Sequence, residues 1–225
     1  IGLGGPATGV TRSERFDITA ASEVMAILSL SKSYDDLRER LGRIIVAESN
    51  SGKPVTAEDL GAAGSMALLL REAMLPNLVQ TLEGNPAFVH CGPFANIAHG
   101  NSSIIADELA LSRSDYVVTE AGFGAEMGAE KALHIKSLAS GISPSCIVLN
   151  VTVRSMKLHG GGVAGGGGSR PTKEEIETEN VEAVRTGASS NLRRHVKNLA
   201  ATSIPVVVSI NRFHADTDAE IEAIR

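Results

Sequence analysis

The segment Pro205-Val206-Val207-Val208-Ser209-Ile210 is almost continuously apolar, and Ile147-Val148-Leu149 upstream has the same character. An apolar run of this kind is typical of a strand that is covered on both faces, as in a parallel sheet flanked by helices. We therefore expect strands over residues 204–211 and 145–153. These two strands are the starting point for the rest of the fold.

Outward from these two strands, the sequence alternates between short apolar runs and helical stretches. Thr56-Ala57-Glu58-Asp59 has the capping residue and first-turn acids of a helix N-terminus. Helices between strands predict crossover connections, and therefore an α/β fold with a mainly parallel sheet and helices on both faces. We expect the whole chain, 1–225, to form one α/β piece. Further strands are expected over 43–47, 77–82, 87–90 and 115–120, and helices over 22–30, 57–73, 101–111, 125–139, 173–185, 191–200 and 216–225.

The composition is that of a globular chain. Of its 225 residues, 43% are hydrophobic and 21% are charged, and the net charge is −5. An acidic chain lacks the concentrated positive charge of nucleic-acid binders, so we expect no nucleic-acid partner. No apolar run of about 18 residues occurs, which predicts no membrane partner. Two cysteines give neither a disulfide framework nor a cysteine zinc site, so a reducing, cytoplasmic location is expected.

Two features concern the ends of the chain and its most unusual segment. The chain starts at Ile1 and stops at Arg225 inside an expected helix, so we expect it to be a piece of a longer protein. Seven of the nine residues from Gly160 to Gly168 are glycine, within an expected loop over 160–171. Ordering such a segment costs much backbone entropy. It is therefore either a flexible surface loop or a loop that a ligand or partner orders.

Ligands of open parallel sheets bind beyond the carboxyl ends of the strands. After the expected strand 87–90 comes a glycine-rich loop, 91–103, that leads into a helix. Its backbone N–H groups could bind an anion. It could equally be an ordinary turn in which Asn101 or Ser102 caps the helix.

The other strand ends carry an aromatic ring, cations and purine-binding side chains. Phe123 lies between two glycines, so its ring either stacks on a ligand or folds back into the core. Arg154 and Lys157 follow residues 147–153 and suit a phosphate or carboxylate, unless they are only solvated. Asn211 and Asp216 could bind a purine ring, although Asp216 could instead be a helix N-cap.

The sequence contains no G-x-x-x-x-G-K-[ST] loop, HExxH, GxSxG or strand-linked GxGxxG motif. The residues alone therefore predict an α/β ligand-binding domain whose strand ends favour anions. They do not name a reaction.

Two uncommon strings resemble the formate–tetrahydrofolate ligase family: PFANIAHG, at residues 93–100, and TEAGFGA, at residues 119–125. Further matching stretches extend the resemblance from about Phe16 to Asp218. They include FDITAASEVMA from Phe16, PNLVQTLE from Pro76 and VTVRSMKLHGG from Val151.

The resemblance implies an enzyme that makes 10-formyltetrahydrofolate, ADP and phosphate from formate, tetrahydrofolate and ATP with Mg²⁺, through formyl phosphate. It also implies a P-loop NTPase-like parent that works as a homo-oligomer, a tetramer in bacterial-type relatives, with a monovalent cation as a further cofactor. The parent would be cytoplasmic, or mitochondrial or cytosolic in a eukaryote. Its phosphate-binding loop lies upstream, so the chain would be an internal or C-terminal-side fragment that is inactive alone.

The resemblance also implies roles for particular residues. Phe123 and Phe213 match aromatic positions on which the folate ring stacks, and a third such aromatic lies beyond the chain. We expect His99, Arg154 and Lys157 to stabilise the anionic acyl phosphate as catalytic residues. Asn211 and Asp216 would lie on the nucleotide side.

Three positions depart from the family pattern. Asn101 stands where many relatives have Cys, Met156 where they have Leu, and His214 where Pro is common. Two other classes remain open: a P-loop ATPase switch, and a non-catalytic ligand-binding or oligomerisation module. A switch ATPase has no need of a stacking aromatic at Phe123.

Overall fold

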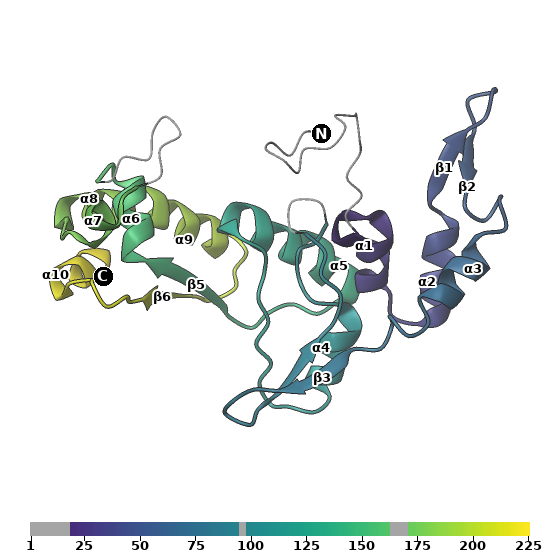
Figure 1. Cartoon of the computed structure of the whole chain (residues 1–225), viewed down its shortest axis with the longest axis horizontal. Helices are drawn as coiled ribbons and strands as arrows, with labels where there is room; N and C mark the ends of the chain where they lie inside the picture. Colours follow the sequence, from purple (N-terminus) through teal and green to yellow (C-terminus); the bar gives the residue numbers. More distant parts are fainter. Residues whose placement is uncertain (1–18, 95–97, 163–170) are drawn as a thin grey trace, which may run out of the picture. The chain divides into compact units, whose positions relative to one another are not determined.

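The computed structural model describes residues 19–94, 98–162 and 171–225 (Figure 1). The chain divides into two compact units, Ile1–Ile142 and Ser143–Arg225. The expectation for the glycine-rich segment falls largely on residues 163–170, which lie outside the described residues.

The first unit is built from short helices and two hairpins (Figure 1). Side-chain hydroxyls of Ser22, Ser33 and Ser103 cap the helices α1, α2 and α4 by accepting a bond from a first-turn N–H. Its core contains Leu28, Leu37, Leu41 and Met74. The elements are η2 (Thr19–Ala21), α1 (Glu23–Leu30), α2 (Tyr34–Gly42), β1 (Ile45–Glu48), β2 (Pro54–Thr56), α3 (Ala63–Leu69), β3 (Asn77–Gln80), β4 (Pro86–Val89), α4 (Ile104–Leu111), the π-helical segments η3 (Gly124–Ala129) and η4 (Ala132–Lys136), and α5 (Ser137–Ser140).

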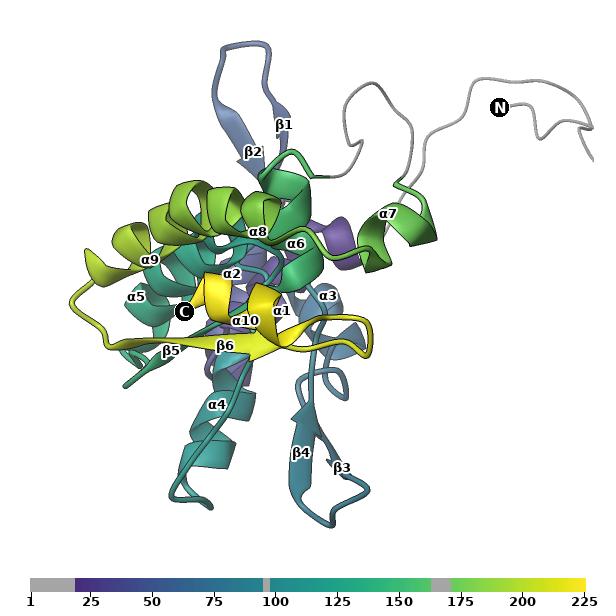
Figure 2. The ribbon, with the colours of Figure 1, turned by 90° about the vertical axis from the view of Figure 1, so that its left-hand side faces the viewer.

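The second unit contains a parallel strand pair and several helices. β5 and β6 run in register from Ile147 opposite Val206 to Thr152 opposite Asn211. Figure 2 shows α6, α8 and α9 on one side of this pair. The buried core is formed by Val151, Val153, Met156, Val184 and Leu192. The elements are β5 (Ile147–Thr152), α6 (Val153–His159), α7 (Lys173–Glu177), α8 (Val181–Gly187), η5 (Ala188–Leu192), α9 (Arg193–Ala200), β6 (Val206–Asn211) and α10 (Asp218–Ile224).

The fold mixes helix and sheet and contains the expected parallel pair, but the expected mainly parallel sheet is not what the described residues form. They form three two-stranded sheets, of which β1–β2 and β3–β4 are antiparallel. The connections explain this, because Gly52 and Gly84, both with positive φ, close loops of a few residues. A parallel crossover needs a dozen residues or more, so such short loops permit only hairpins.

Two further expectations differ from the structure. Residues 115–120 are not a strand: the end of that segment is bonded to the side chain of Asn101 instead of to a neighbouring strand. In addition, Val148 and Val207 on β5 and β6 are exposed, so the described residues do not cover both faces of the pair. No described helix is long and apolar enough to cross a membrane.

Candidate functional site

The carboxyl ends of β5 and β6 meet at one edge of the second unit. α6 begins directly after β5, with Thr152 as its N-cap in a capping box with Ser155. This places Arg154 in the first turn of α6, where its guanidinium carbon lies 4.0 Å from the ring centre of Phe213, just beyond β6. A cation over an aromatic face is attractive. The parallel register thus brings together two of the residues that the sequence analysis selected.

The turn after β6 is fixed by Asp216. This buried carboxylate accepts the N–H of Phe213 at 2.8 Å, and the guanidinium of Arg212 donates to the Asp216 carbonyl at 3.1 Å. The N-cap of α10 is Thr217, not Asp216. Asn211 is exposed at the end of β6. Asp216 therefore holds the backbone of Phe213, while the Asn211 amide is accessible.

Lys157 is buried, and its ammonium group is surrounded by acceptors. It donates to the carbonyls of Ile176 and Thr178 at 2.9 and 2.8 Å, and it pairs with Glu220 at 2.7 Å. These contacts use all three donors of an ammonium group. The same Glu220 carboxylate accepts the N–H of Asn180 at 2.8 Å. Lys157 therefore connects α6 to the ends of α7, α8 and α10.

The environment of Glu220 keeps its carboxylate charged. Burial alone would raise the pKa of Glu220, but the hydrogen bonds from Lys157 and from two backbone N–H groups lower it by more. The charges of this pair are therefore compensated inside the unit.

In the first unit, Phe123 has an almost free ring, 98% exposed. Gly124 follows with φ +77°, and the π-helical segment η3 begins there. A methyl group at Gly128 of η3 would overlap the Gly122 carbonyl, so the two backbones are in direct contact. Of the two alternatives for Phe123, the structure shows an exposed ring rather than a core residue.

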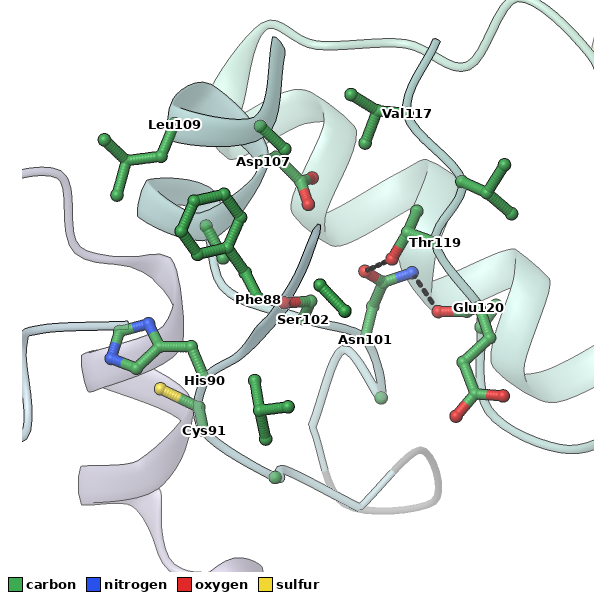
Figure 3. Close-up of a pocket in the computed structure, with 18 of the residues that line it drawn as sticks. Phe88, His90, Cys91, Asn101, Ser102, Asp107, Leu109, Val117, Thr119 and Glu120 are labelled. Atoms are coloured by element: carbon green, nitrogen blue, oxygen red, sulfur yellow. Dashed lines mark hydrogen bonds between the residues drawn. The ribbon is translucent and has the colours of Figure 1, made fainter. Parts of the chain in front are cut away.

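The backbone before Phe123 is held by Asn101 (Figure 3). The Asn101 amide donates to the Glu120 carbonyl at 2.7 Å, and its oxygen accepts the Thr119 hydroxyl at 3.3 Å. A β-bridge joins Asn101 to Ala121, and the Gly122 N–H donates to the Gly100 carbonyl at 2.8 Å. The helix cap is Ser103, so neither Asn101 nor Ser102 takes that role.

Asn101 is itself held by a buried ion pair. Lys136 donates to the Asn101 side-chain oxygen at 2.5 Å and pairs with Asp107 of α4 at the same distance. The exposed fraction of the Lys136 side chain is only 6%. Burial lowers the pKa of Lys136, although Asp107 opposes this effect.

These elements border a cavity of about 1020 Å³ in the first unit. Figure 3 shows Phe88 and Leu109 on one side of it and Asn101 with Thr119 on the other. Phe123 also lines it. Such a volume is typical of small-molecule sites, which combine apolar walls with a few polar groups.

The two histidines of this region are buried. Burial lowers the pKa of His99, and nearby Lys136 lowers it further, so His99 is neutral at pH 7. His90 bonds to the Ser103 hydroxyl at 2.6 Å and to the Ala73 carbonyl at 2.7 Å. Within the described ranges, no group of three or more His, Cys, Asp or Glu residues could hold a metal ion.

The sequence analysis did not predict that the Asn101 side chain bonds to the segment before Phe123. It did not select Lys136, Asp107 or Glu220. For Glu220 a sequence pattern was available, since Thr217 and Glu220 have the spacing of a capping box. Nothing in the sequence around Lys136 indicated burial, because a lysine is almost never buried unless it is paired.

The fold and these strand ends define a class: an α/β-type protein with cationic and aromatic side chains at the carboxyl ends of its parallel strands, the edge at which proteins of this fold bind ligands. Comparison with known proteins specifies the family. The family model for formate–tetrahydrofolate ligase matches residues 1–225. The chain belongs to this family.

Individual relatives agree with the family match. The chain is 54% identical to the formate–tetrahydrofolate ligase of Desulforamulus reducens over 100% of this chain and 39% of that protein. It is 55% identical to that of Granulibacter bethesdensis over 99% of this chain and 37% of that protein. The ligase of Paracoccus denitrificans is 54% identical over 100% of this chain and 39% of its own. The chain thus spans less than two fifths of the length of these relatives.

Proposed function

We propose that this chain forms part of an ATP-dependent formate–tetrahydrofolate ligase that produces 10-formyltetrahydrofolate, ADP and phosphate. The observation that carries the proposal is the family match along the whole chain. In the proposed reaction a formate oxygen attacks the terminal phosphorus of ATP, which gives formyl phosphate and ADP. A folate nitrogen then attacks the formyl carbon and phosphate leaves. Positioning and charge stabilisation are what the protein must supply.

On the folate side, we assign Phe123 and Phe213 to stacking on the pterin ring. The free ring of Phe123 between two glycines supports this assignment, since nothing in the described residues covers it. Phe213 carries the Arg154 guanidinium on one face. Stacking of a flat ring on Phe contributes about 0.5–1.5 kcal/mol beyond burial.

For the anionic acyl phosphate, we assign Arg154 as the side chain whose positive charge contacts it directly. Among the described residues, no carboxylate is within ion-pair distance of its guanidinium. Lys157 would act indirectly. Its donors are occupied by contacts inside the unit, and these contacts hold α6, which carries Arg154. His99 would act as a neutral imidazole. Asn211 would contact the nucleotide through its exposed amide, and Asp216 would contribute by fixing the turn.

The remaining parts of the proposal lie beyond these side chains. ATP would enter with Mg²⁺, and a monovalent cation is a further proposed cofactor. The described residues contain no group of three or more His, Cys, Asp or Glu that could hold a metal ion. The phosphate-binding loop of a P-loop parent would come from sequence outside this chain. We further propose a homo-oligomeric, cytoplasmic enzyme.

The experiment is made in the full-length ligase that contains this chain. Phe123→Ala and Phe213→Ala should each weaken tetrahydrofolate binding by roughly 5- to 150-fold, because a ring contact and its apolar area are lost. The KM for ATP and the melting temperature should stay unchanged. Tyr34→Ala, which removes an exposed aromatic of α2, is the control and should leave both KM values unchanged. An unchanged folate KM with a large loss of stability would refute the stacking role.

A further inference from the structure

The ring of Phe123 has no packing of its own that could fix its direction. At 98% exposure it gains almost nothing from neighbouring side chains. The backbone that carries it, by contrast, is bonded on both sides. Whatever orients the ring must therefore act through this backbone rather than through contacts of the ring.

The Asn101 side chain supplies one bond to that backbone and one to the side chain of a neighbouring residue. Its amide donates to the Glu120 carbonyl at 2.7 Å, and its oxygen accepts the Thr119 hydroxyl. At the β-bridge between Asn101 and Ala121, the Gly122 N–H donates to the Gly100 carbonyl at 2.8 Å. Thr119 and Glu120 are thus bonded to the Asn101 side chain, and Gly122, directly before Phe123, is bonded to the neighbouring Gly100. No regular strand ladder supports the same segment in the described structure.

The asparagine is in turn fixed by groups that cannot easily move. Lys136 is buried and reaches the Asn101 oxygen and the Asp107 carboxylate at 2.5 Å each. Removal of one partner from a buried ion pair is costly, so Lys136 stays in place. After Phe123 in the sequence, Gly128 of η3 lies directly against the Gly122 carbonyl.

We propose that Asn101, clamped by Lys136, is a positioning residue that orients the Phe123 ring for a flat bicyclic ligand of the reduced-pterin type. This inference rests on the proposed function for the identity of the ligand. In this role Asn101 acts through the backbone that carries the ring, not through a contact of its own with the ligand. It limits the rotation of the backbone that carries the ring, so that less conformational entropy is lost when the ligand binds.

A double-mutant cycle in the full-length ligase tests the proposal. Asn101→Ala leaves the Lys136–Asp107 pair intact and should raise the KM and the calorimetric Kd for tetrahydrofolate on the order of 5- to 10-fold, without a change in the KM for ATP. In the Phe123→Ala background the same change should have less than about a 2-fold effect, because there is no ring left to orient. Gln80→Ala, which also removes an amide bonded to a backbone carbonyl, at 3.2 Å, is the matched control and should change neither constant.

Asn101→Asp gives a second variant of nearly the same shape. It keeps the acceptor for Lys136 and loses the donor to Glu120, so it should repeat the rise in the folate constants. Equal effects of Asn101→Ala with and without Phe123 would overturn the positioning role while leaving the proposed function standing. A folate KM unaffected by Phe123→Ala would instead overturn the proposed folate contact, and the positioning role with it. A parallel rise of the ATP and folate constants would also overturn the positioning role.

Discussion

At the scale of single residues, burial decides what the charged side chains of this chain can do. Lys157 and Lys136 would both be solvated if they followed the usual preference of lysine. Instead each ends on a carboxylate inside its unit, Glu220 and Asp107 respectively. Such a lysine cannot offer its charge to a ligand without leaving a carboxylate unpaired. Arg154, which contacts a ring rather than a carboxylate, keeps its charge available.

Lys157→Met should therefore act mainly on stability. It leaves the buried Glu220 without its cation and two carbonyls without a donor, and breaking a buried pair costs about 3–5 kcal/mol. Chemical denaturation followed by circular dichroism would measure the free energy of unfolding. Lys197→Met on α9 removes an exposed lysine and should change it little. A Lys157→Met chain as stable as the parent would contradict this prediction.

His99 predicts a loss of stability on mild acidification. Burial holds the pKa of His99 below its usual 6.5 in the folded chain. As the pH falls below that value, the unfolded chain takes up a proton that the folded chain does not, so the free energy of unfolding decreases. Denaturation at pH 7.5 and pH 5.5, compared between the parent and His99→Gln, should show a smaller pH effect in the variant. Identical pH effects in both would exclude His99 as the cause.

At the scale of elements, close contact of backbones organises the second unit. A methyl group on Gly160 of the α6 terminus would overlap the Ala183 carbonyl, and one on Gly187 of α8 would overlap the Met156 carbonyl. Two helices can approach this closely only where a glycine faces the partner's backbone. The contact places α6, and therefore Arg154, at a fixed position beside α8.

Gly187→Ala should disturb this helix contact. The added methyl forces the two backbones apart, and overpacking of this kind costs about 1–3 kcal/mol. Gly64→Ala in α3 is the matched control, because nothing lies within 4 Å of the added carbon. A helical alanine there should be neutral or up to about 1 kcal/mol stabilising. Thermal unfolding of both variants checks the contrast, and a neutral Gly187→Ala would count against the close contact.

The sequence predicted elements better than their pairing. The apolar runs located β5 and β6 to within two residues at each end, because a parallel, half-covered strand differs in composition from its surroundings. The same kind of run in 77–82 and 87–90 gave no indication that the two strands form a hairpin, which depends on loop length. The expected helix 173–185 is two helices, since Asn180 caps a new one.

The candidate site was predictable to a similar extent. Arg154 was selected as a strand-end residue and Phe213 through the family resemblance, and the parallel register explains why they meet. The hydrogen bonds of Asn101 with Lys136 and with the segment before Phe123 were not predictable, because they join residues far apart in the sequence. A pattern of neighbouring residues contains no information about such contacts.

At the scale of the whole molecule, the chain exposes many large apolar side chains. Exposed fractions reach 91% for Tyr116, 96% for Val118 and 104% for Leu82. Monomeric proteins seldom expose large contiguous apolar patches, and such patches mark surfaces that another part of a protein covers. This agrees with a chain that spans 37–39% of the length of its relatives.

The 225-residue chain alone should therefore form no 10-formyltetrahydrofolate from formate, ATP and tetrahydrofolate. In the proposed reaction, activation of formate passes through phosphoryl transfer, which requires a cradle of N–H groups and a lysine around the phosphates. The sequence contains no G-x-x-x-x-G-K-[ST] loop to supply them. A coupled assay of product formation, with the full-length Desulforamulus reducens ligase as the positive control, measures this directly. Turnover by the isolated chain would show that residues within it activate formate, and would require a phosphate site other than the one proposed.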